Sequence, residues 1–265
     1  MCPPPVLDVR INAFMMLNFH VEGEGAPLLM LHGFGIPFSI WSNLAPLLRP
    51  HFRLIMVALP GLGGSPPLRP EASYYIQARE SIEQVRAHLG IDVWAVLSYS
   101  CGSRAAEQYI RRWPERTSAH VLVCPLHIPG WRWLALRTLA HADAHFPVVG
   151  DVLLSGWRLQ ELVRWLGFNG RRTSGARAWT EEIGAQPVDV LKAMLRDLPD
   201  PGQGLRSLPG PQLFLWGAHD LVAPPPRRLG ASDRLVQAGH NAPQQAADEV
   251  ARHALGFLRG RVTRR

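Results

Sequence analysis

Residues 94–103 read Trp-Ala-Val-Leu-Ser-Tyr-Ser-Cys-Gly-Ser, an apolar run that ends in a cluster of serines. Ser98 stands two positions before Ser100, and Gly102 stands two positions after it. Small residues at these positions allow a strand to turn sharply into a helix, which lifts the central side chain above the edge of a sheet. We therefore predict that Ser100 is a nucleophile at a strand-to-helix turn. Ser98 and Ser103 are rival candidates, but neither has this spacing of small residues.

Short apolar runs on both sides of this turn predict further strands. They are dense in valine, leucine, isoleucine or methionine without clean alternation, which is typical of strands covered on both faces. We expect strands over residues 16–21, 28–31, 54–58, 93–98, 120–124 and 212–216. Stretches that can form helices lie over residues 39–48, 73–89, 102–113 and 243–258. This alternation predicts an α/β fold with a mostly parallel central sheet flanked by helices.

The length of 265 residues suits one large α/β domain. From about residue 126 to about residue 208 the alternation breaks down, and helical-looking stretches carry several tryptophans. These are Trp131, Trp133, Trp157, Trp165 and Trp179. We interpret this segment as a helical cap inserted into a single domain, residues 1–265. The core would then comprise about residues 1–125 and 209–265.

A serine hydroxyl needs a base that takes its proton, and histidine has a suitable pKa. His240 follows a strand-like stretch and a glycine, immediately before the last expected helix. The histidine in turn needs an acid that fixes its tautomer. Asp220 lies in a loop just after the apolar run 212–216. We therefore predict a triad of Ser100, Asp220 and His240, in the chain order serine, acid, histidine.

Acyl transfer also needs hydrogen-bond donors for the oxyanion of the tetrahedral intermediate. Residues 31–35 read Leu-His-Gly-Phe-Gly directly after an apolar strand, and their glycines free the backbone to turn N–H groups into a cavity. We assign the oxyanion hole to the backbone N–H groups of Phe34 and Cys101. We expect His32 to be structural and to hold this loop by hydrogen bonds.

These motifs resemble the α/β-hydrolase superfamily, in particular its small, single-domain bacterial esterase-like members with a helical cap. The resemblance covers nearly the whole chain and includes residues 58–65, where Ala58 replaces the usual aspartate of a D-x-P-G-x-G-x-S loop. Some members carry the acid after the preceding strand, where this chain has Cys124 followed by proline. Epoxide hydrolases and haloalkane dehalogenases of the superfamily use aspartate at the elbow, and Ser100 argues against both. The resemblance implies hydrolysis through an acyl-enzyme.

The substrate is less constrained than the fold, because one fold hosts many reactions. Phe38, Trp41 and Tyr99 lie close to the expected site in sequence and are our candidate pocket residues. They predict a carboxylic ester of a small to medium hydrophobic substrate. A carbon–carbon bond hydrolase or an acyltransferase with the same triad is an alternative. A small-ligand receptor with vestigial hydrolase activity is an alternative of another class.

The formal charge of +7 comes almost entirely from arginine, since Lys192 is the only lysine. The arginines are scattered and form no binding motif, which argues against a nucleic-acid partner. Residues 157–166 combine apolar residues at helical spacing with arginines. A solvated cap helix is our interpretation of that segment, and contact with a membrane surface is the less favoured one.

Three cysteines, Cys2, Cys101 and Cys124, have neither zinc-ligand spacing nor the density of a disulfide scaffold. The start of the chain has no apolar run of signal-peptide type. We expect a cytoplasmic protein with no metal and no cofactor.

Overall fold

The computed structural model describes residues 16–69, 72–126, 174–198 and 204–262, together with positions 138, 158, 160, 161, 164 and 165. Within these residues a seven-stranded sheet has the order β1-β3-β2-β4-β5-β6-β7. Only β1 runs antiparallel to its neighbour β3, and all other pairs are parallel. The prediction of a mostly parallel sheet is confirmed. The strands are β1 (Phe19–Glu22), β2 (Ala26–Leu31), β3 (Phe52–Val57), β4 (Trp94–Tyr99), β5 (Thr117–Val123), β6 (Gln212–Gly217) and β7 (Asp233–Val236).

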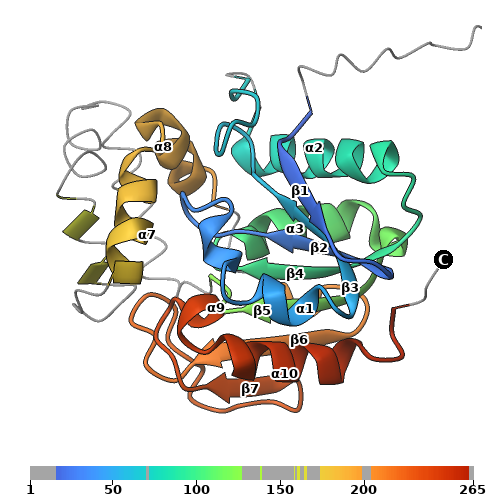
Figure 1. Cartoon of the computed structure of the whole chain (residues 1–265). Helices are drawn as coiled ribbons and strands as arrows, with labels where there is room; N and C mark the ends of the chain where they lie inside the picture. The colour runs from blue at the N-terminus through green and yellow to red at the C-terminus, as the bar shows by residue number, and fades with distance from the viewer. Residues whose placement is uncertain are drawn as a thin grey trace, which may run out of the picture.

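Helices cover both faces of this sheet (Figure 1). On one face α2 (Tyr74–His88) packs on α3 (Gly102–Arg112), and on the other α1 (Ala45–Leu48) packs on α10 (Ala247–Leu258). The short α9 (Ala242–Gln245) precedes α10. Parallel neighbours require such crossovers, because each connection must return to the same end of the sheet. The predicted α/β class is therefore confirmed.

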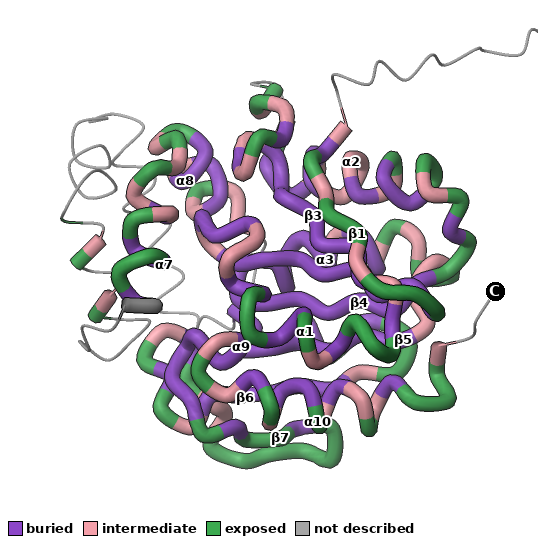
Figure 2. The backbone as a smooth tube through the Cα atoms, in the orientation of Figure 1, coloured by how far each residue is buried: buried purple, intermediate pink, exposed green. Residues whose placement is uncertain are grey.

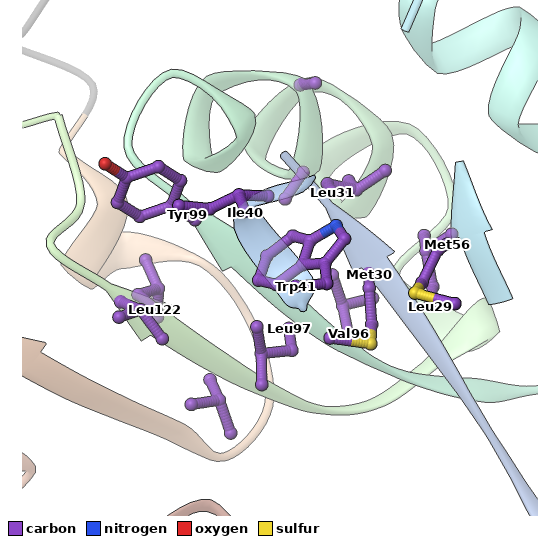
Figure 3. Packing of buried hydrophobic residues seen from close by; sticks show 14 of the residues in the cluster. Leu29, Met30, Leu31, Ile40, Trp41, Met56, Val96, Leu97, Tyr99 and Leu122 are labelled. Carbon is purple, nitrogen blue, oxygen red and sulfur yellow. The ribbon is translucent and has the colours of Figure 1, made fainter. Parts of the chain in front are cut away.

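The central strands are buried on both faces, as their composition predicts. Every residue of β2 and β4 is buried, and the buried tube in Figure 2 runs through the middle of the sheet. Figure 3 shows Trp41 and Tyr99 among the packed side chains of this core. Their rings meet edge to face, with centroids 6.4 Å apart. Burial of this apolar surface supplies most of the driving force for folding.

The boundaries of some elements differ from the sequence prediction. The expected helix over residues 39–48 is a 3-10 turn, η2 (Ser39–Trp41), followed by α1 with proline in its first turn. Proline lacks a backbone N–H and is best accommodated there, so a new helix begins. The strand β7 was not among the predicted strands. Two of its four residues are exposed, so it lacks the apolar density used to recognise the others.

Two described helices fall within the predicted cap, α7 (Ser174–Gly184) and α8 (Val188–Arg196). They contact the core directly. The hydroxyl of Ser39 donates a hydrogen bond to the carboxylate of Glu182 on α7. The hydroxyl of Tyr75 on α2 donates to a backbone carbonyl of α8 at 3.0 Å. The division of the chain into core and cap stays a prediction, since much of residues 126–208 lies outside the described residues.

Other predictions for this segment can be followed only in part. Trp131, Trp133 and Trp157 lie outside the described residues, as does half of the stretch 157–166. Trp165 is exposed, whereas Trp179 is buried. In the part of the chain that the structure describes, no helix has the length and apolarity needed to cross a bilayer.

Candidate active site

Ser100 occupies a sharp turn between β4 and α3. Its φ of 50° lies in the left-handed region, which non-glycine residues rarely adopt outside functional turns. Its backbone N–H donates to the carbonyl of Val123 at 3.1 Å, so the turn is fastened to β5. A Cβ on Gly102 would lie 2.4 Å from the carbonyl oxygens of Leu31 and His32. Only glycine therefore lets α3 start this close to the end of β2.

The rival serines make other bonds. The hydroxyl of Ser98, inside the sheet, lies 2.7 Å from Nε2 of His120. The hydroxyl of Ser103 donates to the carbonyl of Ser100 at 2.6 Å and accepts from the N–H of Leu126 at 3.2 Å. Ser98 and Ser103 therefore hold the turn in place, and Ser100 is the serine that faces the predicted base.

The structure brings the three predicted triad residues together from loops that follow β4, β6 and β7. Oγ of Ser100 lies 2.8 Å from Nε2 of His240, and Nδ1 of His240 lies 2.8 Å from Oδ2 of Asp220. The other carboxylate oxygen, Oδ1, accepts the N–H groups of Val222 and Ala223, each at 2.8 Å. This arrangement keeps the imidazole proton on Nδ1 and leaves Nε2 free to accept a proton from the serine.

Ser100, His240 and Asp220 are all nearly buried, with 4%, 5% and 4% of their surfaces exposed. A buried charge–dipole relay is stronger than one in water, because the surrounding dielectric is low. The three side chains lie at the carboxyl ends of parallel strands, where ligand sites form in open α/β sheets. The geometry suits proton transfer from a serine hydroxyl to a histidine.

The two predicted oxyanion-hole donors lie in the described part of the chain. Among the described residues, the backbone N–H groups of Phe34 and Cys101 have no acceptor. The adjacent Gly33 lies against the elbow, since a Cβ there would meet Cβ of Ser100 at 3.0 Å and the ring of Tyr99 at 2.8 Å. The loop can therefore approach the nucleophile only with glycine at this position. Its role as an oxyanion hole stays a prediction.

His32 holds this loop, as the sequence predicts. Its Nδ1 lies 2.6 Å from the carbonyl of Gly33, and its Nε2 accepts the N–H of Leu59 at 2.8 Å. Burial lowers the pKa of His32 to about 4, so the ring is neutral and Nδ1 donates. The loop around Ala58, which lacks the usual aspartate, is fastened by the hydroxyl of Ser65, which donates to the Ala58 carbonyl at 2.7 Å.

The candidate pocket residues lie at different depths. Tyr99 is buried beside the base, with its ring centroid 5.4 Å from that of His240. Trp41 is buried in the core behind it. Phe38 is partly buried and meets the ring of His20 edge to face, with centroids 4.3 Å apart. Contact with a substrate stays a prediction for all three.

Both described thiols, Cys101 and Cys124, lie near the triad, and the sequence pattern predicts no role for Cys124. Burial raises the pKa of Cys101 to about 11, so its thiol is not a nucleophile at neutral pH. Cys124 follows β5 with a φ of 42°, and its Sγ donates to the carbonyl of Gly239 at 3.8 Å. Burial and the nearby carboxylate of Asp220 raise the pKa of Cys124 well above its usual range. The only signal in the sequence was its place directly after an apolar run.

The fold and this arrangement define a class, the serine hydrolases of the α/β-hydrolase fold. The family model for that fold matches residues 26–146. Over these residues the chain is similar to the α/β-hydrolase family.

Several curated relatives narrow the comparison to esterases. A pimeloyl-[acyl-carrier protein] methyl ester esterase from Aeromonas salmonicida is 28% identical over 91% of this chain and 93% of its own length. The enzyme of the same description from Methylococcus capsulatus is 27% identical over 94% and 90%. Among solved structures, a thermophilic esterase from Thermogutta terrifontis matches with a TM-score of 0.75 and 22% identity, over 92% of this chain and 93% of that one. All three of these similar proteins are described as esterases.

Proposed function

We propose that this chain hydrolyses a carboxylic ester by two-step acyl transfer, with Ser100 as nucleophile, His240 as general base and Asp220 as the acid that orients it. Ser100 Oγ attacks the acyl carbon while its proton passes to Nε2 of His240. The same nitrogen returns that proton to the departing alcohol, which leaves an acyl-enzyme. Water then attacks the acyl carbon and gives a proton to Nε2 of His240, which passes it to Oγ of Ser100 as the acid departs.

One observation carries this proposal: both hydrogen bonds of the relay, Ser100 to His240 and His240 to Asp220, are 2.8 Å long with the correct nitrogen facing each partner. A general base must lie within about 2.6–3.2 Å of the proton it takes. The N–H groups of Phe34 and Cys101 supply the oxyanion hole in this scheme. Each such donor contributes about 10²–10³ in rate.

Two observations suggest the substrate class: the descriptions of the relatives and the burial of Ser100. The curated relatives are described as methyl ester esterases that act on an acyl chain carried by an acyl carrier protein. A methyl ester presents the smallest alcohol group, which suits a nucleophile that exposes only 4% of its surface. We propose a methyl ester, or another ester of a small alcohol, on a medium-length hydrophobic acyl chain.

The test combines covalent labelling with turnover. Purified protein is treated with a fluorophosphonate probe and digested, and the labelled peptide is identified by mass spectrometry. Wild type is compared with Ser100→Ala and with Ser98→Ala, a matched control because Ser98 lies in the same strand end and bonds to His120 instead. Labelling should be confined to Ser100 and should persist in Ser98→Ala.

Two turnover assays then measure how the rate depends on acyl chain length. The first follows hydrolysis of p-nitrophenyl esters of graded chain length, and the second follows methanol release from methyl esters of the same acids. Turnover that rises to a maximum at medium chain length supports the proposal. Absence of label at Ser100, or failure to hydrolyse any of these esters, would overturn it. A vinylogous diketone cleaved much faster than every ester would instead support carbon–carbon hydrolysis, and tight ligand binding without turnover would support a receptor.

A further inference from the structure

A sulfur, an oxygen and a nitrogen donor meet at the back of the candidate triad. One ligand atom each from Cys124, Asp220 and His240 lies within 4.8 Å of the other two. All three residues are buried. The proposed hydrolysis uses Asp220 and His240 but assigns no role to the thiol of Cys124. This thiol nevertheless lies close to both side chains, directly after β5.

The backbone holds this thiol in place at a conformational cost. Cys124 has a φ of 42°, a left-handed conformation that a non-glycine residue keeps only where the surrounding structure enforces it. Its N–H donates to the carbonyl of Leu215 on β6 at 2.7 Å, and its Sγ donates to the carbonyl of Gly239. The strained residue is therefore fastened to the strand that leads to Asp220 and to the residue that precedes His240.

We propose that Cys124, Asp220 and His240 form a binding site for a thiophilic divalent cation such as Zn²⁺ or Cd²⁺, and that occupation of this site switches off the serine. Thiolate, carboxylate and neutral imidazole are each zinc ligands in proteins, and a site with three protein ligands takes water in the fourth position. Two anionic ligands neutralise a dication, so the buried site as a whole would carry no net charge. Soft thiolate ligands select such cations over Mg²⁺ and Ca²⁺.

The required rearrangement is small. Metal–ligand bonds of about 2.0–2.3 Å place tetrahedral ligand atoms about 3.5 Å apart. The Asp220 oxygen and His240 Nδ1 are already 2.8 Å apart, and the sulfur lies within 4.8 Å of its partners. Movements of about 1 Å therefore close the site around a cation.

The proton balance explains the inhibition. On binding, the thiol of Cys124 loses its proton to solvent and the sulfur bonds to the metal. Nδ1 of His240 also bonds to the metal, so the imidazole proton moves from Nδ1 to Nε2. Nε2 then presents a proton to Oγ of Ser100 and can no longer accept one. No oxidant or other reactant is required, and removal of the metal reverses each step.

The test has a spectroscopic arm that is independent of ester hydrolysis. Cys2→Ser is introduced in every protein, so that the two described thiols are the only ones present. Each protein is titrated with CdCl₂ in a non-chelating buffer, and ultraviolet cadmium–thiolate absorption is recorded. Cys124→Ser is compared with Cys101→Ser, a matched control that removes the other buried thiol. The absorption should be lost in Cys124→Ser and retained in Cys101→Ser.

In the kinetic arm, ester hydrolysis is measured against ZnCl₂ and CdCl₂, and each variant is normalised to its own metal-free rate. Cys124→Ser should raise the half-inhibitory concentration by more than the 10–100-fold that loss of an outer-shell partner typically causes. EDTA should restore the wild-type rate. Absorption that persists in Cys124→Ser, or equal metal sensitivity of both variants, overturns the proposal.

A wild-type crystal soaked in ZnCl₂ provides a second test, which does not depend on the folding of Cys124→Ser. Anomalous density between Cys124, Asp220 and His240 supports the site, and density only elsewhere overturns it. If the protein binds cadmium at Cys124 but hydrolyses no ester, the metal site is supported and the proposed hydrolase function is not.

Discussion

Replacement of Asp220 by asparagine tests the relay most directly. Oδ1 of Asp220 is held by two backbone N–H groups, and Oδ2 accepts the proton on Nδ1 of His240. An asparagine keeps its single oxygen toward the two backbone donors, because turning its NH₂ group toward them would leave both unpaired in a buried site. The NH₂ group then faces Nδ1 and donates to it, which places the imidazole proton on Nε2.

With Nε2 protonated, His240 cannot take the proton of Ser100. The equivalent amide replacement in a serine-protease triad lowers kcat by about 10⁴, or about 5.4 kcal/mol in activation free energy. We expect a loss of that size for Asp220→Asn, with KM for a p-nitrophenyl ester changed far less. Stability should change little, because both backbone bonds survive.

The assay is steady-state hydrolysis of p-nitrophenyl butyrate, with the folded fraction checked by circular dichroism. Asp233→Asn is the matched control. Asp233 is also a buried aspartate, bonded to Trp216 and Arg206, but it has no contact with the relay. That variant should lose stability and keep kcat within a few-fold of wild type. A kcat for Asp220→Asn within about tenfold of wild type would refute the relay as drawn here.

Two further predictions concern the scaffold around the site. Gly102→Ala should destabilise the protein by about 3 kcal/mol or more, because its Cβ would overlap two carbonyl oxygens. Gly256→Ala in α10 is the control, because nothing lies within 4 Å of the added Cβ, and in thermal unfolding it should be neutral or stabilising. Burial lowers the pKa of His32 to about 4 and that of His120 to about 3, so below pH 6.5 the unfolded chain binds protons that the folded chain does not. The free energy of unfolding should therefore fall as the pH drops from 6.5, by about 2 kcal/mol per histidine at pH 5. In urea unfolding, His120→Gln should remove about half of this pH dependence. An unchanged dependence would contradict the assignment.

The parts that the sequence predicts well are those in which local chemistry decides. Dense apolar runs predicted β2 to β6, since a strand covered on both faces must be apolar throughout, whereas the edge strand β1 is partly exposed and begins at Phe19 instead of residue 16. The elbow was recognisable because Ser100 needs small neighbours to adopt a left-handed turn, and the structure places it at φ 50°.

The parts that the sequence missed depend on neighbours distant in the chain. The strand β7 has two exposed residues of four, and only its pairing with β6 makes it a strand. The thiol of Cys124 acquires chemical interest only because the loops after β6 and β7 bring Asp220 and His240 to it. No pattern within a short window carries that information.

The sequence by itself determined the class of fold, the serine at the elbow and the order of serine, acid and histidine along the chain. Tertiary structure alone decided that Ser100 and His240, 140 positions apart, meet at 2.8 Å, and that a buried thiol lies behind them. The reason is physical: propensity and periodicity act over a turn or a strand, whereas a hydrogen bond between distant loops is fixed by strand order and register. Those are set by the packing of the whole sheet between its helices.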